Sequence, residues 1–457
     1  MKNRLDEIGA GATAVSHGKG LLALSPIIVF LLLYVAVSAA IGDFYKMPLS
    51  IAFIVASVWA MALMGRMRVA ERIEVFSTGA ANSNILYMIW IFIMAGAFSA
   101  LANGIGAIDA TVDLALRVLP AWFLLPGLFL TACFISMSIG TSVGTVVALT
   151  PFAVELASTT GGSVPFYVSV ALGGSFFGDN LSFISDTTIA ATRNLQVQMN
   201  DKFKANIWIA LPAALITVAV YATLGGIADA VPYAPHAMAQ WHLVIPYLVV
   251  IVLAVLGINV LVVLSLGIAS CLVIAAFGNY ALIDLCTTMG GGIKDMSDLI
   301  IVTLLAAGLL EVISFNGGIT YIISILTRLC HGKRGAQAVI ALLVSLVNVC
   351  TANNTIAIIT VGKIARQIAI KFDLDPRKVA SLLDTCSCIV QCIIPYGAQT
   401  LLAAGLAKVS PVAFLPYLYY AWALTAVVIC SIVFNFPRLS TSPNAEPTDA
   451  EHNAARC

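Results

Sequence analysis

The residues with the clearest chemical potential lie in a polar stretch, residues 173–188, inside an otherwise apolar part of the chain. Two aspartates, Asp179 and Asp186, are seven positions apart there, which places both on one face of a continuous helix. An ionised side chain at the centre of a bilayer costs about 2.5–3.5 kcal/mol or more unless protein, water or an ion satisfies it. Carboxylates in this setting usually mark an ion or substrate site. We therefore expect Asp179 and Asp186 to bind a sodium ion or a proton.

Three hydroxyl side chains of the same stretch, those of Ser182, Ser185 and Thr187, could complete an oxygen-lined cation site. Hard cations such as sodium prefer oxygen ligands, and a helix that unwinds at residues 178–185 would add free backbone carbonyls. Burial disfavours the ionised form of a carboxylate and a bound cation favours it, so one aspartate can hold either a proton or a sodium ion. The alternative is a polar seam between packed helices, although such seams use serine and threonine far more often than carboxylates.

A second candidate lies in the C-terminal half, where Asp384 and Gln391 precede a helix break at Pro395 and Gly397. Asp384 is a further candidate for cation or proton binding, and Gln391 is a candidate for the substrate cavity. A simple polar contact between two helices explains this pair equally well.

Two apolar regions, residues 119–158 and 335–370, carry polar residues in their middle. Each is predicted to be a helical hairpin that enters the membrane and returns, with its polar tip at depth. Helix N-termini at such tips could hold an anion, for example a substrate carboxylate. The residues expected to line a substrate cavity there and beside Asp179 are Asn180, Thr141, Ser142, Thr145, Asn353, Asn354 and Thr355.

The elements that must position these residues are membrane spans. The 457-residue chain is 60% hydrophobic and only 10% charged, whereas soluble proteins contain about 25% charged residues. A span needs about 20 mostly apolar residues, and this measure predicts ten spans besides the two hairpins. The predicted spans are residues 20–42, 48–64, 85–103, 164–193, 204–226, 242–256, 259–277, 297–314, 379–405 and 412–435.

Composition also argues against several function classes. The net charge of +1 speaks against a nucleic-acid partner. The first apolar run, residues 20–41, is too long for the core of a cleavable signal peptide. Cys386, Cys388 and Cys392 fall close together without a nearby histidine, so neither a transition-metal site nor a cofactor is expected.

The two halves of the chain show related patterns. A shift of 211 residues lays the break at 140–145 on residues 351–356 and Pro165 on Pro376. Each half would hold five spans and one hairpin, and an odd number of spans inverts the second half relative to the first. We therefore expect an all-α polytopic membrane protein with about ten transmembrane helices plus two re-entrant helical hairpins, in two inverted repeats with broken helices.

The expected segments follow from this arrangement. They are a cytoplasmic tail at 1–19, a first repeat at 20–226 with hairpin 119–158 and broken helix 164–193, an outer linker at 227–241, a second repeat at 242–435 with hairpin 335–370 and broken helix 379–405, and a disordered tail at 436–457. With the N-terminus inside, 19 of the 23 basic residues fall in cytoplasmic segments and 4 in outer segments. This split predicts that both termini are cytoplasmic, in the cytoplasmic (inner) membrane.

The polar stretch resembles a known family signature. Residues 178–188 read Gly-Asp-Asn-Leu-Ser-Phe-Ile-Ser-Asp-Thr-Thr. NhaC-type sodium/proton antiporters, of the ion transporter superfamily, typically read Gly-Asp-Lys-x-Ser-Pro-x-Ser-Asp-Thr-Thr there. Residues 140–145 resemble the Gly-Thr-Ser-x-Gly-Thr element of that family, and residues 383–384 and 394–396 resemble its Glu-Asp and Ile-Pro-Trp elements. The resemblance covers most of the chain from about residue 85 to 410.

Three positions depart from the family pattern. Asn180 stands for the usual lysine, Phe183 for proline and Leu383 for glutamate. The missing lysine removes a fixed positive charge from the expected site, which bears on the transported ion and on the stoichiometry.

The resemblance implies a secondary antiporter that exchanges sodium for protons by alternating access and is not an enzyme. The alternative is a sodium- or proton-coupled exchanger of a small organic acid or amino acid, whose carboxylate the hairpin tips could hold. An intramembrane aspartyl protease would need a Gly-x-Gly-Asp motif, which is absent, and a channel would need a repeated filter, which is not evident. Expected partners are membrane lipid, sodium and protons; a homodimer and a small organic anion or amino acid stay open.

Overall fold

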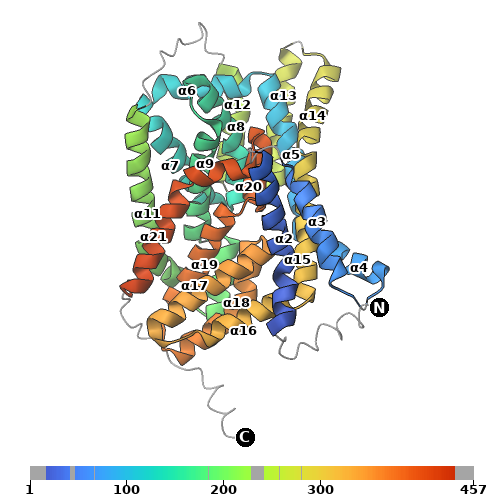
Figure 1. Cartoon of the computed structure of the whole chain (residues 1–457). Coiled ribbons are helices and arrows are strands. Elements are labelled where there is room, and N and C mark those ends of the chain that lie inside the picture. Colours follow the sequence, from blue (N-terminus) through green and yellow to red (C-terminus); the bar gives the residue numbers. More distant parts are fainter. Residues whose placement is uncertain are drawn as a thin grey trace.

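The computed structural model describes residues 17–41, 47–65, 67–183, 185–227, 241–256, 258–278 and 280–437. Every regular element in these ranges is a helix, which confirms the predicted all-α fold class (Figure 1). Nearly all of the predicted linker at 227–241 and of the tails at 1–19 and 436–457 lies outside the described residues.

The helices of the first half are α2 (His17–Ile41), α3 (Leu49–Ala62), α4 (Val69–Ala80), α5 (Ser83–Gly104), α6 (Ala107–Val118), the 3-10 helix η1 (Ala121–Phe123), α7 (Leu124–Ile139), α8 (Ser142–Thr160), α9 (Val164–Leu181), α10 (Asp186–Leu195) and α11 (Met199–Ile227). Those of the second half are η2 (Trp241–Val244), α12 (Ile245–Val255), α13 (Val260–Phe277), α14 (Leu282–Asp295), α15 (Ser297–Phe315), α16 (Gly318–Arg328), α17 (Gly332–Thr351), α18 (Asn354–Lys371), α19 (Pro376–Ile393), α20 (Ala398–Ala407), η3 (Pro411–Tyr417) and α21 (Tyr419–Val433).

Eight helical segments within the described residues are long and apolar enough to cross a membrane. The bent pair η3 and α21, with an angle of 56° between its parts, would be a ninth. Three of the eight, Ala121–Ile139, Ser142–Thr160 and Gly332–Thr351, are arms of the predicted hairpins. Of the ten other predicted spans, 20–42, 48–64 and 242–256 correspond to shorter apolar helices, and 164–193 is divided into α9 and α10. The chain is thus a multi-pass membrane protein.

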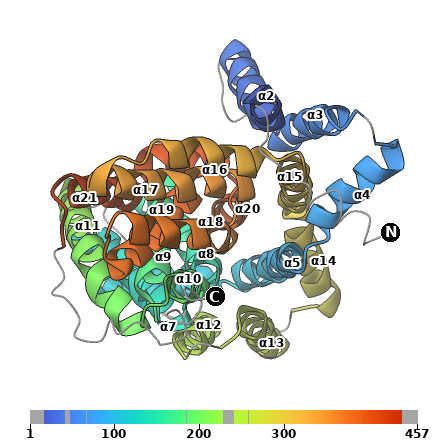
Figure 2. The same ribbon diagram turned by 90° about the horizontal axis from the view of Figure 1, so that it is seen from below.

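The helices gather into two groups (Figure 2). Helices α7–α11 and α17–α21 form one compact group, in which α7 packs on α9, α17 on α19 and α11 on α21. Helices α2–α5 and α13–α15 lie beside this group, with α5 packed on α13 and α14, and α15 packed on α3 and α4. All the predicted site residues belong to the compact group.

The predicted broken helices are interrupted where the sequence removes the helical hydrogen bonds. The span at 164–193 is two helices, α9 and α10, and Ser185 caps α10 because its Oγ accepts a hydrogen bond from Thr188 N at 3.2 Å. In the second half α19 ends at Ile393. Ile394 is extended (φ −66°, ψ 127°), as expected of a residue that precedes a proline, and Pro395 has no N–H to donate.

Both hairpins turn in the same two-residue geometry. Gly140 (φ 74°) and Ala352 (φ 47°) are left-handed, and the extended residues Thr141 and Asn353 follow them. A left-handed residue ends a helix, and the extended residue then begins the next one. The positions differ by 352 − 140 = 212 residues.

The same offset relates other unusual backbone positions. Gly161 and Asp373, and likewise Gln196 and Lys408, are left-handed pairs 212 residues apart, whereas Gly106 and Gly317 are 211 apart. The offset used from the sequence, 211, is therefore one residue short from the first hairpin tip onward. This recurrence favours a two-repeat organisation, and the inverted relation of the repeats stays a prediction.

Candidate functional site

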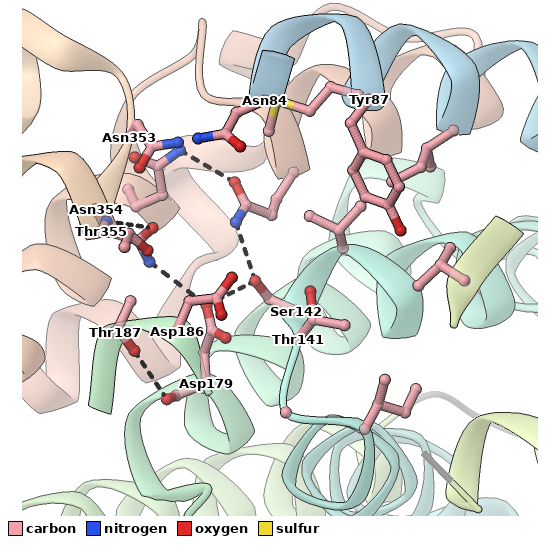
Figure 3. Close-up of a pocket in the computed structure, with 18 of the residues that line it drawn as sticks. Asn84, Tyr87, Thr141, Ser142, Asp179, Asp186, Thr187, Asn353, Asn354 and Thr355 are labelled. Carbon is pink, nitrogen blue, oxygen red and sulfur yellow. Dashed lines mark hydrogen bonds between the residues drawn. The ribbon is translucent and has the colours of Figure 1, made fainter. Parts of the chain in front are cut away.

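A cavity of about 360 Å³ lies where the two hairpin tips meet the two broken helices (Figure 3). Nine predicted residues line it: Thr141, Ser142, Asp179, Asp186, Thr187, Asn353, Asn354, Thr355 and Gln391. Residues that were not predicted also line it, among them Asn84 and Tyr87 of α5, Asn259 before α13, and Gln399 of α20. Figure 3 shows the two groups of tip residues on either side of Asp179.

Asp179 is the buried acid of this cavity. It lies in the last turn of α9 and its side chain is 6% exposed. Its Oδ2 accepts a hydrogen bond from Ser142 Oγ at 2.8 Å and a long one from Asn354 Nδ2 at 3.5 Å. These donors are the first residues of α8 and α18, so each hairpin presents one neutral donor to the same carboxylate.

Two glutamines extend the network along the cavity wall. Gln399 Nε2 donates to Ser142 Oγ at 3.0 Å, and Gln391 Nε2 donates to Gln399 Oε1 at 3.1 Å and to Ala352 O at 3.0 Å. Gln391 Oε1 is buried and has no hydrogen-bond donor among the described residues. Buried polar atoms normally have a partner, so this oxygen is available to a cation or an N–H donor in the cavity.

The offset of 212 places these residues in equivalent pairs. Asp179 corresponds to Gln391, Ser142 to Asn354, and Thr187 to Gln399. All six residues line the cavity. The offset of 211 hides this correspondence because it lays Val390 on Asp179 and Gln391 on Asn180, one position out of step. At the offset of 212 the charged residue of the pair 179/391 lies in the first half and the neutral amide lies in the second.

Asp186 is the second carboxylate of the cavity and differs from Asp179 in its surroundings. It is the first residue of α10 and is exposed. No hydrogen bond or ion pair to its side chain is present in the described part of the chain. Its position at a helix N-terminus favours its negative charge.

Two backbone carbonyls at the start of the break, those of residues 179 and 180, are already hydrogen-bonded, although free carbonyls were expected across the break. Asp179 O accepts hydrogen bonds from Ser185 Oγ at 2.7 Å and from Thr187 Oγ1 at 3.3 Å. Asn180 O accepts from Lys202 Nζ at 2.7 Å and from Asn206 Nδ2 at 2.6 Å. Because the protein already satisfies these two oxygens, a cation in the cavity must rely mainly on side chains.

Five predicted site residues do not line the cavity. They are Asn180, Ser182, Ser185, Thr145 and Asp384. Ser182 Oγ donates to Met137 O at 2.9 Å, which holds the break against the end of α7, and Thr145 Oγ1 is 3.4 Å from Thr141 O within its own hairpin. These two residues support the frame of the site rather than its surface.

Asp384 lies behind the cavity in a buried ion pair with Lys202 of α11. The two side chains are 0% and 1% exposed. Lys202 Nζ also donates to Thr188 Oγ1 at 2.9 Å, and the Asp384 Oδ1 atom accepts a weak contact from Cys388 Sγ at 3.5 Å. A dyad of two acids that share one proton would not contain a lysine, so the arrangement differs from that of an aspartyl protease.

Lys202 is the residue that sequence reasoning missed. It was counted among the cytoplasmic basic residues, whereas the structure buries it. One signal could have found it: Asn206, four residues further on, is also polar and lies on the same helix face. Both side chains contact Asn180, so the positive charge missing from position 180 enters from another helix.

The charges of the cavity wall are all negative. Among the described residues that line it, Asp179 and Asp186 are charged, and none is a lysine, arginine or histidine. Within the described ranges no group of three or more His, Cys, Asp or Glu could hold a metal ion. The wall offers amide, hydroxyl and carboxylate oxygens, which suit a hard monovalent cation or an organic ammonium group.

A multi-pass helical fold with an acidic cavity at interrupted helices is typical of secondary transporters. A family profile described as the Na⁺/H⁺ antiporter family matches residues 12–227 and 174–436, which together span more than half of the chain. The chain belongs to this family and is an antiporter by membership. The resemblance to NhaC-type antiporters is thereby confirmed.

Curated relatives with different cargo are similar over most of their length. The chain is 22% identical to the malate-2H⁺/Na⁺-lactate antiporter of Bacillus subtilis, over 89% of this chain and 93% of the relative. It is 24% identical to the arginine/ornithine antiporter ArcD of Halobacterium salinarum, over 96% of each chain. It is also 24% identical to the Na⁺/H⁺ antiporter NhaC of Bacillus subtilis, over 74% of this chain and 80% of the relative.

Among solved structures, the YdaH transporter of Alcanivorax borkumensis is 15% identical, with a TM-score of 0.40 over 80% of this chain and 88% of that one.

Proposed function

We propose that the protein exchanges sodium for protons across the cytoplasmic membrane by alternating access, with both termini on the cytoplasmic side. The observation that carries this proposal is Asp179, a buried carboxylate in a cavity whose wall has no positive charge. Its partners Ser142 and Asn354 are neutral donors, so the protein itself does not neutralise its charge.

The coupling follows from this uncompensated charge. An ionised Asp179 without a counter-ion is costly in a membrane interior, so the carboxyl group favours either a proton or a bound cation. A sodium ion that enters from one side stabilises the ionised form and releases the proton. Protonation on the other side releases the sodium ion. One carboxylate cannot hold both, and exchange results.

Asp186 has a supporting role in this proposal. It lines the same cavity but is exposed, so it attracts cations toward Asp179 and adds an oxygen ligand. Gln391 Oε1 and the Thr141 hydroxyl are further oxygens within the cavity wall. Sodium would thus be held by side chains from the first hairpin and both broken helices.

The deciding experiment is sodium-driven dissipation of a pH gradient in everted vesicles. Asp179→Asn keeps the size of the side chain but cannot titrate, so it should abolish the response while the protein still inserts. The control is Asp373→Asn, which removes an exposed carboxylate between α18 and α19 whose pKa the Lys333 ammonium lowers. Wild-type activity in Asp179→Asn, with an unchanged pH profile, would refute the role of Asp179.

A second candidate function has its own supporting observation. A volume of about 360 Å³ is far larger than one ion needs and lies within the range of small-molecule sites, about 300–1,000 Å³. The N-termini of α8, α10 and α18 all face the cavity, and Asp179 could bind an ammonium group there. An amino acid or a small organic acid therefore fits as cargo.

The two candidates are separated by transport into proteoliposomes. Sodium/proton exchange predicts proton movement with sodium as the only added solute. Exchange of an organic solute predicts no proton movement with sodium alone. Proton movement should then appear when one member of a panel of organic acids and amino acids is added.

A further inference from the structure

The Lys202 ammonium lies in a site that has the chemistry of a cation site. It contacts three oxygens of different kinds: the Asn180 carbonyl at 2.7 Å, the Thr188 hydroxyl at 2.9 Å and the Asp384 carboxylate. These oxygens come from α9, α10 and α19, and the site is fully buried. An ammonium has three donors, and here each one has an acceptor.

The position of this site in the fold is also that of a cation site. Asn180 lies in the last turn of α9, where the helix breaks in the membrane, so its carbonyl has no helical partner. The C-terminal end of a helix carries a partial negative charge, and such ends of broken helices coordinate cations in transporters. The Asp384 carboxylate adds a full charge at the same point.

We infer that Lys202 is a built-in cation that permanently occupies an internal ion site formed by Asp384, Thr188 and Asn180. The ammonium occupies the position between these three oxygens and prevents a free sodium ion from binding there. The chain therefore carries one sodium ion fewer than the same frame with this site vacant. The inference rests on the proposed function only in taking sodium as the ion tested.

The sequence departure at position 180 fits this inference. The NhaC-type signature has lysine where this chain has Asn180, and the Lys202 side chain reaches the backbone of that same residue. Asn206 Nδ2 meanwhile donates to the Asn180 side-chain oxygen at 2.8 Å. The positive charge is thus kept although its position in the sequence has changed.

The test measures binding of radioactive ²²Na⁺ to purified protein, with choline to hold ionic strength constant. All variants carry Asp179→Asn, so that the cavity acid does not contribute. We expect no saturable sodium binding by Asp179→Asn alone, about one sodium per chain once Lys202→Ala is added, and none again when Asp384→Asn is added to both. A potassium arm shows whether the vacated site discriminates between cations.

Several results would overturn the inference. One is absence of sodium binding in Asp179→Asn/Lys202→Ala; another is binding that persists after Asp384→Asn. If the Lys202→Ala protein aggregates in choline, sodium present during extraction must recover a monodisperse protein, and failure to do so also counts against the inference.

A relocation variant gives a second, independent measurement. Asn180→Lys combined with Lys202→Ala returns an ammonium to the same site from a different helix. The double variant should have a melting temperature close to that of the wild type, whereas Lys202→Ala alone should have a lower one. The double variant should also bind no additional sodium. Sodium/proton exchange by the wild-type protein decides the proposed function separately, because none of these binding measurements depends on it.

Discussion

Two aspartates of this chain show how surroundings set the role of one residue type. Asp179 faces a cavity and has only neutral donors, whereas Asp384 is bound to the Lys202 ammonium. The lysine already supplies a partner charge to Asp384, so that carboxylate does not face the cavity alone as Asp179 does. The sequence alone offered both as candidates of the same kind.

The Ser142 hydroxyl should stabilise the ionised form of Asp179, since it donates to Oδ2 at 2.8 Å. Hydrogen bonds to charged groups contribute about 1.5–3 kcal/mol. Ser142→Ala should therefore weaken apparent sodium affinity about tenfold or more. It should also move the activity optimum to higher pH, because a less stable carboxylate anion loses its proton to sodium only at a lower proton concentration. The measurement is exchange rate against sodium concentration at several pH values.

A matched control for this variant is Ser138→Ala, which removes a serine hydroxyl that donates to Phe134 O within its own helix. Its sodium affinity and pH profile should equal those of the wild type. Equal behaviour of the two serine variants would remove Ser142 from the site.

At the scale of elements, the hairpin tips place the N-termini of α8 and α18 at the cavity. Thr141 and Asn353 are the extended residues at the two turns, and both line the cavity. Replacement of either by leucine should block transport while expression falls little, although loss of the Asn353 cap on Ile356 N costs about 1 kcal/mol. Transport assays on equal amounts of reconstituted protein test this, and unchanged rates in both variants would contradict a lining role.

The contact between α7 and α9 depends on glycine. A methyl group at Gly174 would lie 2.6 Å from Ala132 Cβ and from Phe129 O, so the two helices would have to separate. Such overpacking costs about 1–3 kcal/mol. Gly174→Ala should lower the melting temperature in detergent and, since α9 carries Asp179, reduce transport as well.

The control for this change is Gly290→Ala on α14, where a methyl group would meet nothing within 4 Å. Its melting temperature should stay at or slightly above that of the wild type, because alanine favours helix more than glycine does. A loss in Gly290→Ala as large as that in Gly174→Ala would rule out helix separation as the cause.

For the whole molecule, orientation is the open geometric question. Burial removes Lys202 and Lys378 from the surface, so the split of basic residues becomes 19 − 2 = 17 against 4, which leaves the predicted orientation unchanged. Single cysteines at positions 16 and 442, in a cysteine-free background, should resist an impermeant reagent added outside intact cells. Labelling of either position would contradict the predicted topology.

The sequence by itself determined the class of the protein and pointed to Asp179 as a candidate site residue. In a bilayer every backbone group must be satisfied locally, so long apolar runs can only be helices, and polar residues inside them mark the breaks. For this reason the all-α fold was predicted correctly, and the structure has helix turns at residues 140–141 and 352–353 and helix ends at residues 181 and 393, inside the stretches where the sequence places breaks.

Only the tertiary structure decided which charges meet. Lys202 is buried and Lys204, two residues later, is exposed, and no local sequence pattern predicts this difference. The partner of Lys202 lies 182 positions away, and Gln399, which bonds to Ser142, lies 257 positions away. Such pairs depend on how the two halves of the chain pack together. The offset of 212 between corresponding positions of the two halves is likewise seen only in the backbone conformation. Local patterns therefore located the site, and packing between distant helices determined its charge.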